Sequence, residues 1–429
     1  MKFLKKIFPY IFLIISTFLL TYTFYKSEIY WDGTKSQYYL KYYFFSLTLV
    51  LFSIINFFLK DNIREYLVII FSSIIVTLYT FEMYLTFNNE IKKSYLYKQK
   101  TGKKFDKRTK LQIYDDLKKK NDKIKLTVYP SSYLNLNSLF PFSGVSNSKT
   151  IYCNENGFYS IYKSDRYGFN NPDDEWSNEK IEYLLVGDSY THGACVNRPD
   201  DIASVLRLLS KKSVLNLGYG DTGPLIHYAI LREYLKKNVK KILWIYYEGN
   251  DLQNLKKELK NNVLSKYYEN ENFSQNLKKK QNEIDKVAND MISQSLNIDK
   301  SQNSKFLNLL KLYKIRTSIF NENKKSIPPK SEFKKIISSV KKLSKENNSK
   351  LFFIYLPDYY RYTKNFDNSN YKLVRDIIKD LDIEFIDIHQ EIFDKEQNPK
   401  QLFPFEQFGH YNKAGYKKIA EKLFQITKD

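Results

Sequence analysis

The sequence of 429 residues has few of the residues that cross-link or loosen a fold: 2 cysteines, 4 histidines, 13 glycines and 11 prolines. The cysteines, Cys153 and Cys195, are too few for a disulfide framework or a cysteine-based zinc site, and no CxxC pair occurs. One bridge between them and a pair of free thiols both fit the sequence. The motifs HExxH and GxxxxGK[ST] are absent, so zinc-protease and P-loop chemistry have no support. No metal or redox cofactor is implied.

Acidic residues are also scarce relative to basic ones, with 47 Asp and Glu against 69 Lys and Arg and a net charge of +22. The positive charge is spread along the chain and no nucleic-acid-reading motif accompanies it, so we expect no nucleic-acid partner. Hydrophobic residues make up 43% of the chain and aromatic residues 17%, which excludes a wholly disordered or collagen-like protein. The length predicts two to three domains of about 150 residues each.

Three apolar runs lie within residues 1–87. They cover residues 7–25, 42–59 and 66–87, and only Glu82 interrupts the third. Because a helix needs ~20 apolar residues to cross a bilayer, each run predicts a transmembrane helix. The alternative for the first run is a cleaved signal peptide, but bulky residues follow it instead of a small-residue cleavage site. We therefore expect a three-helix membrane anchor with the lipid bilayer as partner.

The region that follows the anchor has two parts. Residues 88–127 are basic and charge-dense, which predicts a solvated helical stalk, with a patch lying on anionic headgroups as the alternative. Residues 128–178 are rich in Tyr, Ser and Asn and contain turn signals. They predict a leader of short strands and loops that caps the next domain.

From residue 179 to residue 429 apolar strands alternate with amphipathic helices, which is typical of a mostly parallel sheet covered on both faces. The alternation breaks at about 253–330, where a polar, helix-like insertion forms either a solvated excursion or a lid. The predicted strands are 181–186, 213–217, 241–247, 351–356 and 383–388, and the predicted helices are about 200–211, 224–238, 332–346, 370–380 and 412–427.

The residues that follow the strands point to acyl transfer. Ligands of open α/β sheets bind outside the carboxyl ends of the strands. Ser189 follows the first strand, Gly220 the second and Asn250 the third, and His410 precedes the last helix. His410 is the candidate base for a Ser189 nucleophile. The N–H groups of Ser189 and Gly220 and the amide of Asn250 are the candidate oxyanion hole.

These residues resemble the sequence blocks of the SGNH (GDSL-like) hydrolase family. The resemblance implies a flavodoxin-like three-layer α/β/α hydrolase domain over residues 179–429, acting on an ester of a glycan, lipid or envelope polymer. Residues 128–178 are similar to the leader of membrane-anchored members. The matching blocks, in family order, are Gly187-Asp188-Ser189, Gly220, Gly249-Asn250-Asp251, and His410 with Asn412 and Gly415.

One position departs from the family pattern. The family usually has Asp three residues before the histidine, and this chain has Gln407 there. A triad acid orients the imidazole and stabilises its protonated form. Glu406, beside Gln407, and Asp387, from the preceding strand, are the candidate acids. The alternatives are a backbone carbonyl holding His410, a slower dyad, or a site that no longer hydrolyses.

Two other motifs weaken on inspection. Residues 218–223 match the dinucleotide fingerprint GxGxxG, but Asp221 would place a carboxylate where an anionic pyrophosphate must bind. Ser189 does not lie in a GxSxG elbow, which disfavours the α/β-hydrolase fold. His192 either lines the pocket or is structural. Structural roles are expected for the remaining candidates, Asp188, His227, Asp251 and His389.

The pattern as a whole predicts a membrane-anchored serine esterase that hydrolyses or transfers acyl groups, acetyl among them, through a Ser189 acyl-enzyme. One alternative is a membrane-tethered binding or assembly module that keeps the fold, and another is a sugar O-acyltransferase working with a partner channel. The resemblance favours an extracytoplasmic domain, whereas the lysines flanking the apolar runs favour a cytoplasmic one. The oligomeric state stays open.

Overall fold

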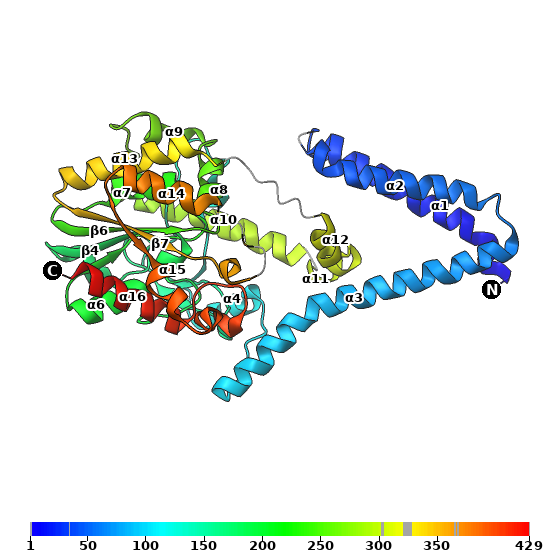
Figure 1. Ribbon diagram of the computed structural model, residues 1–429, viewed down its shortest axis with the longest axis horizontal. Coiled ribbons are helices and arrows are strands. Elements are labelled where there is room, and N and C mark those ends of the chain that lie inside the picture. The colour runs from blue at the N-terminus through cyan, green and yellow to red at the C-terminus, as the bar shows by residue number, and fades with distance from the viewer. Residues whose placement is uncertain are drawn as a thin grey trace. The chain divides into compact units, whose positions relative to one another are not determined.

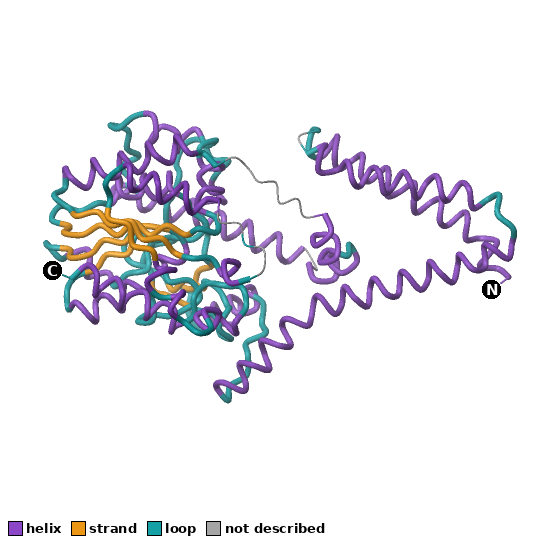
Figure 2. Tube along the Cα trace, in the orientation of Figure 1, coloured by secondary structure: helices purple, strands orange, loops and turns teal. Residues whose placement is uncertain are grey.

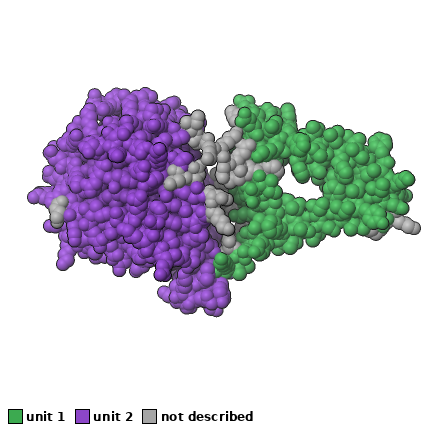
Figure 3. All heavy atoms as spheres, viewed as in Figure 1, with its two compact units in different colours: residues 1–92, 302–325 green, residues 93–301, 326–429 purple. Residues whose placement is uncertain are grey.

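The computed structural model describes residues 2–33, 35–301, 304–320, 328–363, 366 and 369–428. The chain divides into two compact units, residues 1–92 with 302–325 and residues 93–301 with 326–429 (Figure 3). The first unit holds the apolar helices, and the second holds the α/β domain with its leader.

Three helices of the chain are long and apolar enough to cross a membrane: α1 (Lys2–Phe24), α2 (Ser36–Asn56) and α3 (Asp61–Thr101). A short π-helical segment, Tyr25–Tyr30, extends α1. Small polar side chains pack between α1 and α2, where the Ser16 hydroxyl donates to the Ser53 hydroxyl at 3.2 Å. Small residues let apolar helices approach closely, as they do inside membranes. Two short helices, α11 (Ser304–Leu310) and α12 (Tyr313–Phe320), complete the first unit.

A five-stranded parallel sheet forms the centre of the second unit (Figure 2). Its order is β5-β4-β6-β7-β8, which is the flavodoxin-like order 2-1-3-4-5 when the strands are counted along the chain. The predicted fold class is therefore confirmed. The strands are β4 (Ile181–Gly187), β5 (Val214–Asn216), β6 (Val239–Tyr247), β7 (Lys350–Leu356) and β8 (Glu384–Asp387).

Helices cover both faces of this sheet (Figure 1). One face packs against α7 (Pro224–Tyr234), α13 (Lys330–Glu346) and α14 (Ser369–Asp380), and the other against α6 (Ile202–Ser210) and α16 (Lys413–Thr427). Side chains alternate along a strand, so each strand contributes to both layers. Leu184 and Trp244 are buried in one core, and Tyr183 and Leu243 in the other. Apolar residues on both faces explain why these strands appear as continuous apolar runs.

The leader forms a small sheet of its own. Helix α4 (Lys110–Lys118) precedes β1 (Ile124–Leu126), β2 (Lys149–Ile151) and β3 (Ile161–Lys163), which are ordered β1-β2-β3. Buried amides bind the leader to the loops at the sheet edge. Asn170 Nδ2 donates to the His192 carbonyl at 2.9 Å, and Asn171 Nδ2 to the Asn216 carbonyl at 2.8 Å.

The insertion between β6 and α13 is helical in the second unit. It contains α8 (Asp251–Glu258), α9 (Asn262–Glu269) and α10 (Gln281–Ser301), of which α8 and α9 pack against α7. Val263, Leu264 and Ile284 are buried in the same core as α7. These helices therefore extend the hydrophobic core beyond the sheet.

Candidate active site

Ser189 begins the short helix α5 (Ser189–His192) directly after β4. Asp188 caps this helix, because its carboxylate accepts the N–H of Tyr190 at 2.9 Å. Gly187 ends the strand where any Cβ would lie 2.4 Å from the Ile245 carbonyl oxygen of β6, so only glycine fits. The tight turn places the Ser189 hydroxyl at the carboxyl edge of the sheet, and Asp188 has the structural role expected of it.

His410 lies in the loop before α16, 221 residues from Ser189 in the sequence. Its Nε2 is 2.8 Å from the Ser189 Oγ, a hydrogen bond in which the serine hydroxyl donates when Nδ1 carries the proton. Tyr190 supports the ring from one side, with its own ring centroid 4.7 Å away and its hydroxyl donating to the Gly409 carbonyl at 3.3 Å. Asn412 fixes the loop by accepting the Gly415 N–H at the start of α16.

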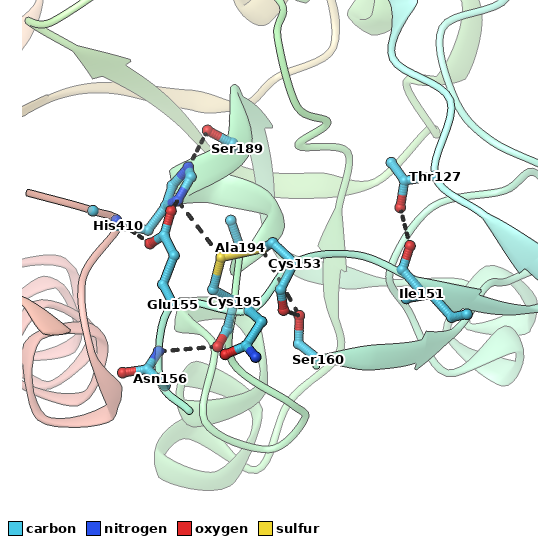
Figure 4. Close-up of a disulfide and its surroundings, with 12 residues drawn as sticks. Thr127, Ile151, Cys153, Glu155, Asn156, Ser160, Ser189, Ala194, Cys195 and His410 are labelled. Atoms are coloured by element: carbon cyan, nitrogen blue, oxygen red, sulfur yellow. Dashed lines mark hydrogen bonds and ion pairs between the residues drawn. A yellow bond between two sulfur atoms is a disulfide. The ribbon is translucent and has the colours of Figure 1, made fainter. Parts of the chain in front are cut away.

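Glu155 occupies the far side of the imidazole (Figure 4). His410 Nδ1 and Glu155 Oε1 are 3.1 Å apart, and the His410 backbone N–H donates to Glu155 Oε2 at 2.6 Å. One carboxylate thus binds both the ring and the backbone of the same residue. Glu155, His410 and Ser189 form a continuous hydrogen-bonded chain of acid, base and hydroxyl, which is the geometry of a catalytic triad.

The structure corrects the expected identity of the acid. Asp387 instead caps helix α15 (Ile388–Glu391) through the His389 N–H at 2.9 Å and accepts the Tyr371 hydroxyl at 2.6 Å. It ends β8, which is three strands from β4 and so about 14 Å away at the spacing of a sheet. Glu406 takes part through its backbone carbonyl, which accepts the Tyr359 hydroxyl at 3.0 Å.

A disulfide holds Glu155 in place. Cys153 is bonded to Cys195, which comes three residues after α5. Asn156 Nδ2 adds a hydrogen bond to the Cys195 carbonyl at 3.0 Å (Figure 4). The leader residues on both sides of Glu155 are thus attached to the segment that follows the serine. The acid was overlooked because it lies in the leader, but an acid two residues after one cysteine of the only pair was a usable signal.

Opposite charges perturb the pKa values of both acid and base. Burial opposes ionisation of Glu155, but the positive charge and hydrogen bonds of His410 outweigh it, and the pKa of Glu155 lies below its ordinary value. Burial alone would lower the pKa of His410, but the charge and hydrogen bond of Glu155 and the charge of Asp188 raise it above the ordinary value. The site therefore stabilises an imidazolium paired with a carboxylate, the state that forms when His410 takes a proton.

The other two predicted oxyanion residues lie on either side of Ser189. Gly220 follows β5 and Asn250 follows β6, the two strands that flank β4 in the sheet. A Cβ at Gly220 would lie 2.2 Å from the Tyr152 hydroxyl, so glycine lets the leader pack on this loop. The carboxamide oxygen of Asn250 is buried without a hydrogen-bond partner among the described residues. Unpaired buried polar groups are costly, which is consistent with a side chain kept for a ligand.

The remaining histidines are structural. His192 is buried, stacks on Tyr152 with ring centroids 4.4 Å apart, and has its pKa lowered to about 3 by burial. His227 lies 3.0 Å from the Thr222 hydroxyl, and burial lowers its pKa to about 3. Glu155, Cys195 and His410 lie close enough together to suggest a metal site. The Cys195 sulfur is already in the disulfide, however, and cannot bind a metal as a thiolate.

Exposed aromatic rings lie next to the base. Phe408, two residues before His410, is 55% exposed and stacks on Tyr360, which is 50% exposed, with ring centroids 5.1 Å apart. Tyr359 contacts both rings from one side. Two residues of backbone span at most ~7 Å, so this aromatic rim, Tyr359, Tyr360 and Phe408, lies beside the catalytic loop.

No protein-family model matches the chain, and no curated protein matches it. Two solved structures are similar to part of it. One is a protein described as lipolytic and of the G-D-S-L family from Desulfitobacterium hafniense DCB-2, with 14% identity, a TM-score of 0.34, and coverage of 58% of this chain and 99% of its own. The other is an acetyl xylan esterase, AlAXEase, with 13% identity, a TM-score of 0.35, and coverage of 58% and 100%.

Proposed function

We propose that the chain is a serine esterase of the SGNH type that hydrolyses or transfers acyl groups. The observation that carries the proposal is the hydrogen-bonded chain from Glu155 through His410 to Ser189. The same observation weakens the alternative of an inactive binding module, which relied on the absence of an Asp at position 407. Gly220 and Asn250 support the proposal by their places beside the nucleophile.

The proposed reaction begins when His410 Nε2 takes the hydroxyl proton of Ser189 as its oxygen attacks the ester carbonyl. The carbonyl oxygen becomes an oxyanion, which the N–H groups of Ser189 and Gly220 and the amide of Asn250 stabilise. The ester C–O bond then breaks, His410 gives its proton to the departing alcohol, and an acyl group stays on Ser189. Water or a second alcohol attacks that acyl group, with His410 again as base, and releases Ser189.

Labelling with a fluorophosphonate probe tests the nucleophile. We expect the purified full-length protein to be labelled once, at Ser189, and Ser189→Ala to lose both labelling and ester hydrolysis. Ser160→Ala, in the same leader segment as Glu155, is the matched control and should keep both. Absence of labelling in a folded protein would contradict the proposal. Adding a glycan acceptor to the reaction separates transfer from hydrolysis, because transfer yields an acylated glycan in place of free acid.

The substrate class that we propose is an acylated glycan. The aromatic rim presents two flat, exposed rings next to His410. Monomeric proteins rarely leave adjoining large apolar side chains exposed without a binding role. Sugar rings carry apolar C–H faces that stack on aromatic rings and hydroxyl groups that stay in water, and this suits a half-exposed rim.

Removal of one ring tests this substrate class. We expect Phe408→Ala to raise KM for a polymeric acetylated glycan about 10-fold, since a stacked aromatic contact is worth ~1 kcal/mol or more. The same variant should hydrolyse a small activated acetyl ester at the wild-type rate, because the ring does not contact the reacting atoms. Leu208→Ala, an exposed apolar residue on α6, is the control. An equal loss on both substrates would show that Phe408 positions the His410 loop and does not bind the glycan.

The location that we propose is the extracytoplasmic face of a membrane, with α1, α2 and α3 as the anchor. The three helices have the length and composition for spanning. The disulfide between Cys153 and Cys195 supports the outer side, since such bonds persist in oxidising compartments and are rare in the cytosol. It also outweighs the lysine distribution, because long domains cross membranes largely regardless of their charge.

A further inference from the structure

Helices α11 and α12 belong to the membrane-type unit although the sequence places them inside the hydrolase domain. They lie between α10 and α13, yet residues 302–325 form one compact unit with residues 1–92 (Figure 3). The segment leaves the α/β domain, packs on the apolar helices and returns.

Glu82 provides the principal contact. It is the single acidic residue within the third apolar run, and it is 1% exposed. Its two carboxylate oxygens accept the backbone N–H groups of Lys314 and Ile315 at 2.8 and 2.9 Å, at the first turn of α12. A carboxylate at the N-terminus of a helix satisfies unpaired N–H groups and the positive end of the helix dipole. A buried acid inside an apolar helix thus has a specific partner, as such residues require.

Further contacts place α12 at one end of the apolar helices. The Tyr79 hydroxyl of α3 donates to the Leu310 carbonyl at 3.0 Å. The Arg316 guanidinium acts electrostatically on Tyr39 and Tyr42, near the start of α2. The start of α2 and the Glu82 end of the third apolar run lie on the same side of a three-helix anchor, the side from which the hydrolase domain follows. Glu82 is five residues before Phe87, or about 7–8 Å along the helix, which is interfacial depth.

The same segment exposes apolar side chains. Large exposed apolar residues in so short a segment are unfavourable in water, and they lie beside helices whose own exposed residues are apolar. Basic residues accompany them, as they do in helices that lie at a membrane interface. The exposed apolar residues of the segment are Phe306, Leu307, Leu310, Tyr313 and Ile319, and its described basic residues are Lys311, Lys314 and Arg316.

We propose that residues 304–320 are a second membrane-contacting element, a helical pair inserted into the interface of one leaflet and held there by Glu82. This rests on the membrane anchor of the proposed function and adds to it. The occupant of the exposed apolar face is the lipid bilayer itself. The hydrolase domain is then attached to the membrane at two places, through α3 and through the insertion, and this confines its active site to substrates near the membrane surface.

Site-specific fluorescence on the full-length protein tests the proposal. The native disulfide leaves no free thiol, so one added cysteine can be labelled with an environment-sensitive dye. Ile319→Cys reports on α12, Leu51→Cys on the apolar face of α2, and Leu208→Cys, exposed on α6, on the hydrolase domain. The protein is placed in nanodiscs of phosphatidylethanolamine and phosphatidylglycerol with or without lipids that carry a quencher.

We expect quenching at position 319 to be close to that at position 51 and at least threefold greater than at position 208. Glu82→Leu should lower quenching at position 319 at least twofold and leave position 51 unchanged, because the helix loses its acceptor. Quenching at 319 equal to that at 208, with 51 strongly quenched, would overturn the second attachment while leaving the anchor intact. Absence of quenching at 51 would overturn both. An unchanged signal in Glu82→Leu would refute the role of Glu82.

Discussion

Replacement of Glu155 by glutamine should lower kcat/KM for an activated acetyl ester by roughly 10³–10⁴-fold, the scale seen when a triad acid becomes its amide. The amide keeps the size of the side chain but no longer stabilises the imidazolium, and it also allows the wrong tautomer of His410. Steady-state kinetics on the full-length protein measure the effect. The protein should remain folded, since the exchange keeps an acceptor for the His410 backbone N–H.

The matched control for this variant is Glu406→Gln, which changes the acid that the sequence had suggested and should keep wild-type activity. The pH profile provides an independent readout. Because Glu155 helps to raise the pKa of His410, and neutral His410 is the active base, the acidic limb of kcat/KM should move to lower pH in Glu155→Gln. A full loss of activity in Glu406→Gln, or an acidic limb that does not move, would contradict the assignment of Glu155.

Loss of the disulfide should destabilise the hydrolase domain by about 4 kcal/mol, the loop-entropy value for cysteines 42 residues apart. For a domain of this size that corresponds to a fall of about 10 °C in Tm. We also expect ester hydrolysis to fall at least 10-fold at a temperature where the reduced protein is folded, because Glu155 lies two residues from Cys153. Thermal unfolding and kinetics with and without dithiothreitol measure both effects.

The double variant Cys153→Ala with Cys195→Ala is the control for this experiment, since dithiothreitol should not change it further. Alkylation of thiols in intact cells reports the native redox state, and protection of both cysteines is expected for an extracytoplasmic domain. A reduced protein with unchanged Tm and unchanged activity would contradict the positioning role of the bond. Free thiols in the cellular protein would contradict the proposed side of the membrane.

The two experiments probe one arrangement from opposite ends. Glu155→Gln removes the charge while the loop stays in place, and reduction frees the loop while the charge stays. Variants of the pair combined test their independence. If the disulfide acts through Glu155, reduction should have little further effect on kcat/KM in Glu155→Gln, whereas two separate contributions would multiply.

Local patterns in the sequence determined most of the fold. Strands buried on both faces appear as apolar runs, and amphipathic helices between them require crossovers, so the five strands from β4 to β8 were predicted close to their observed limits. Ser189, Gly220, Asn250 and His410 could be proposed because each lies directly beside an element end. The carboxyl ends of parallel strands share one edge, so local positions implied proximity.

Only the tertiary structure decided the acid and the place of the insertion. Glu155 lies in a leader outside the α/β alternation, and it reaches His410 because of the disulfide and the buried amides of the leader. Asp387 follows a strand as expected, but the strand order puts it at the far edge of the sheet. Residues 304–320 pack with Glu82 and not with their neighbours in sequence. Periodicity records which face of an element is buried, whereas contacts between distant segments depend on how the whole chain packs.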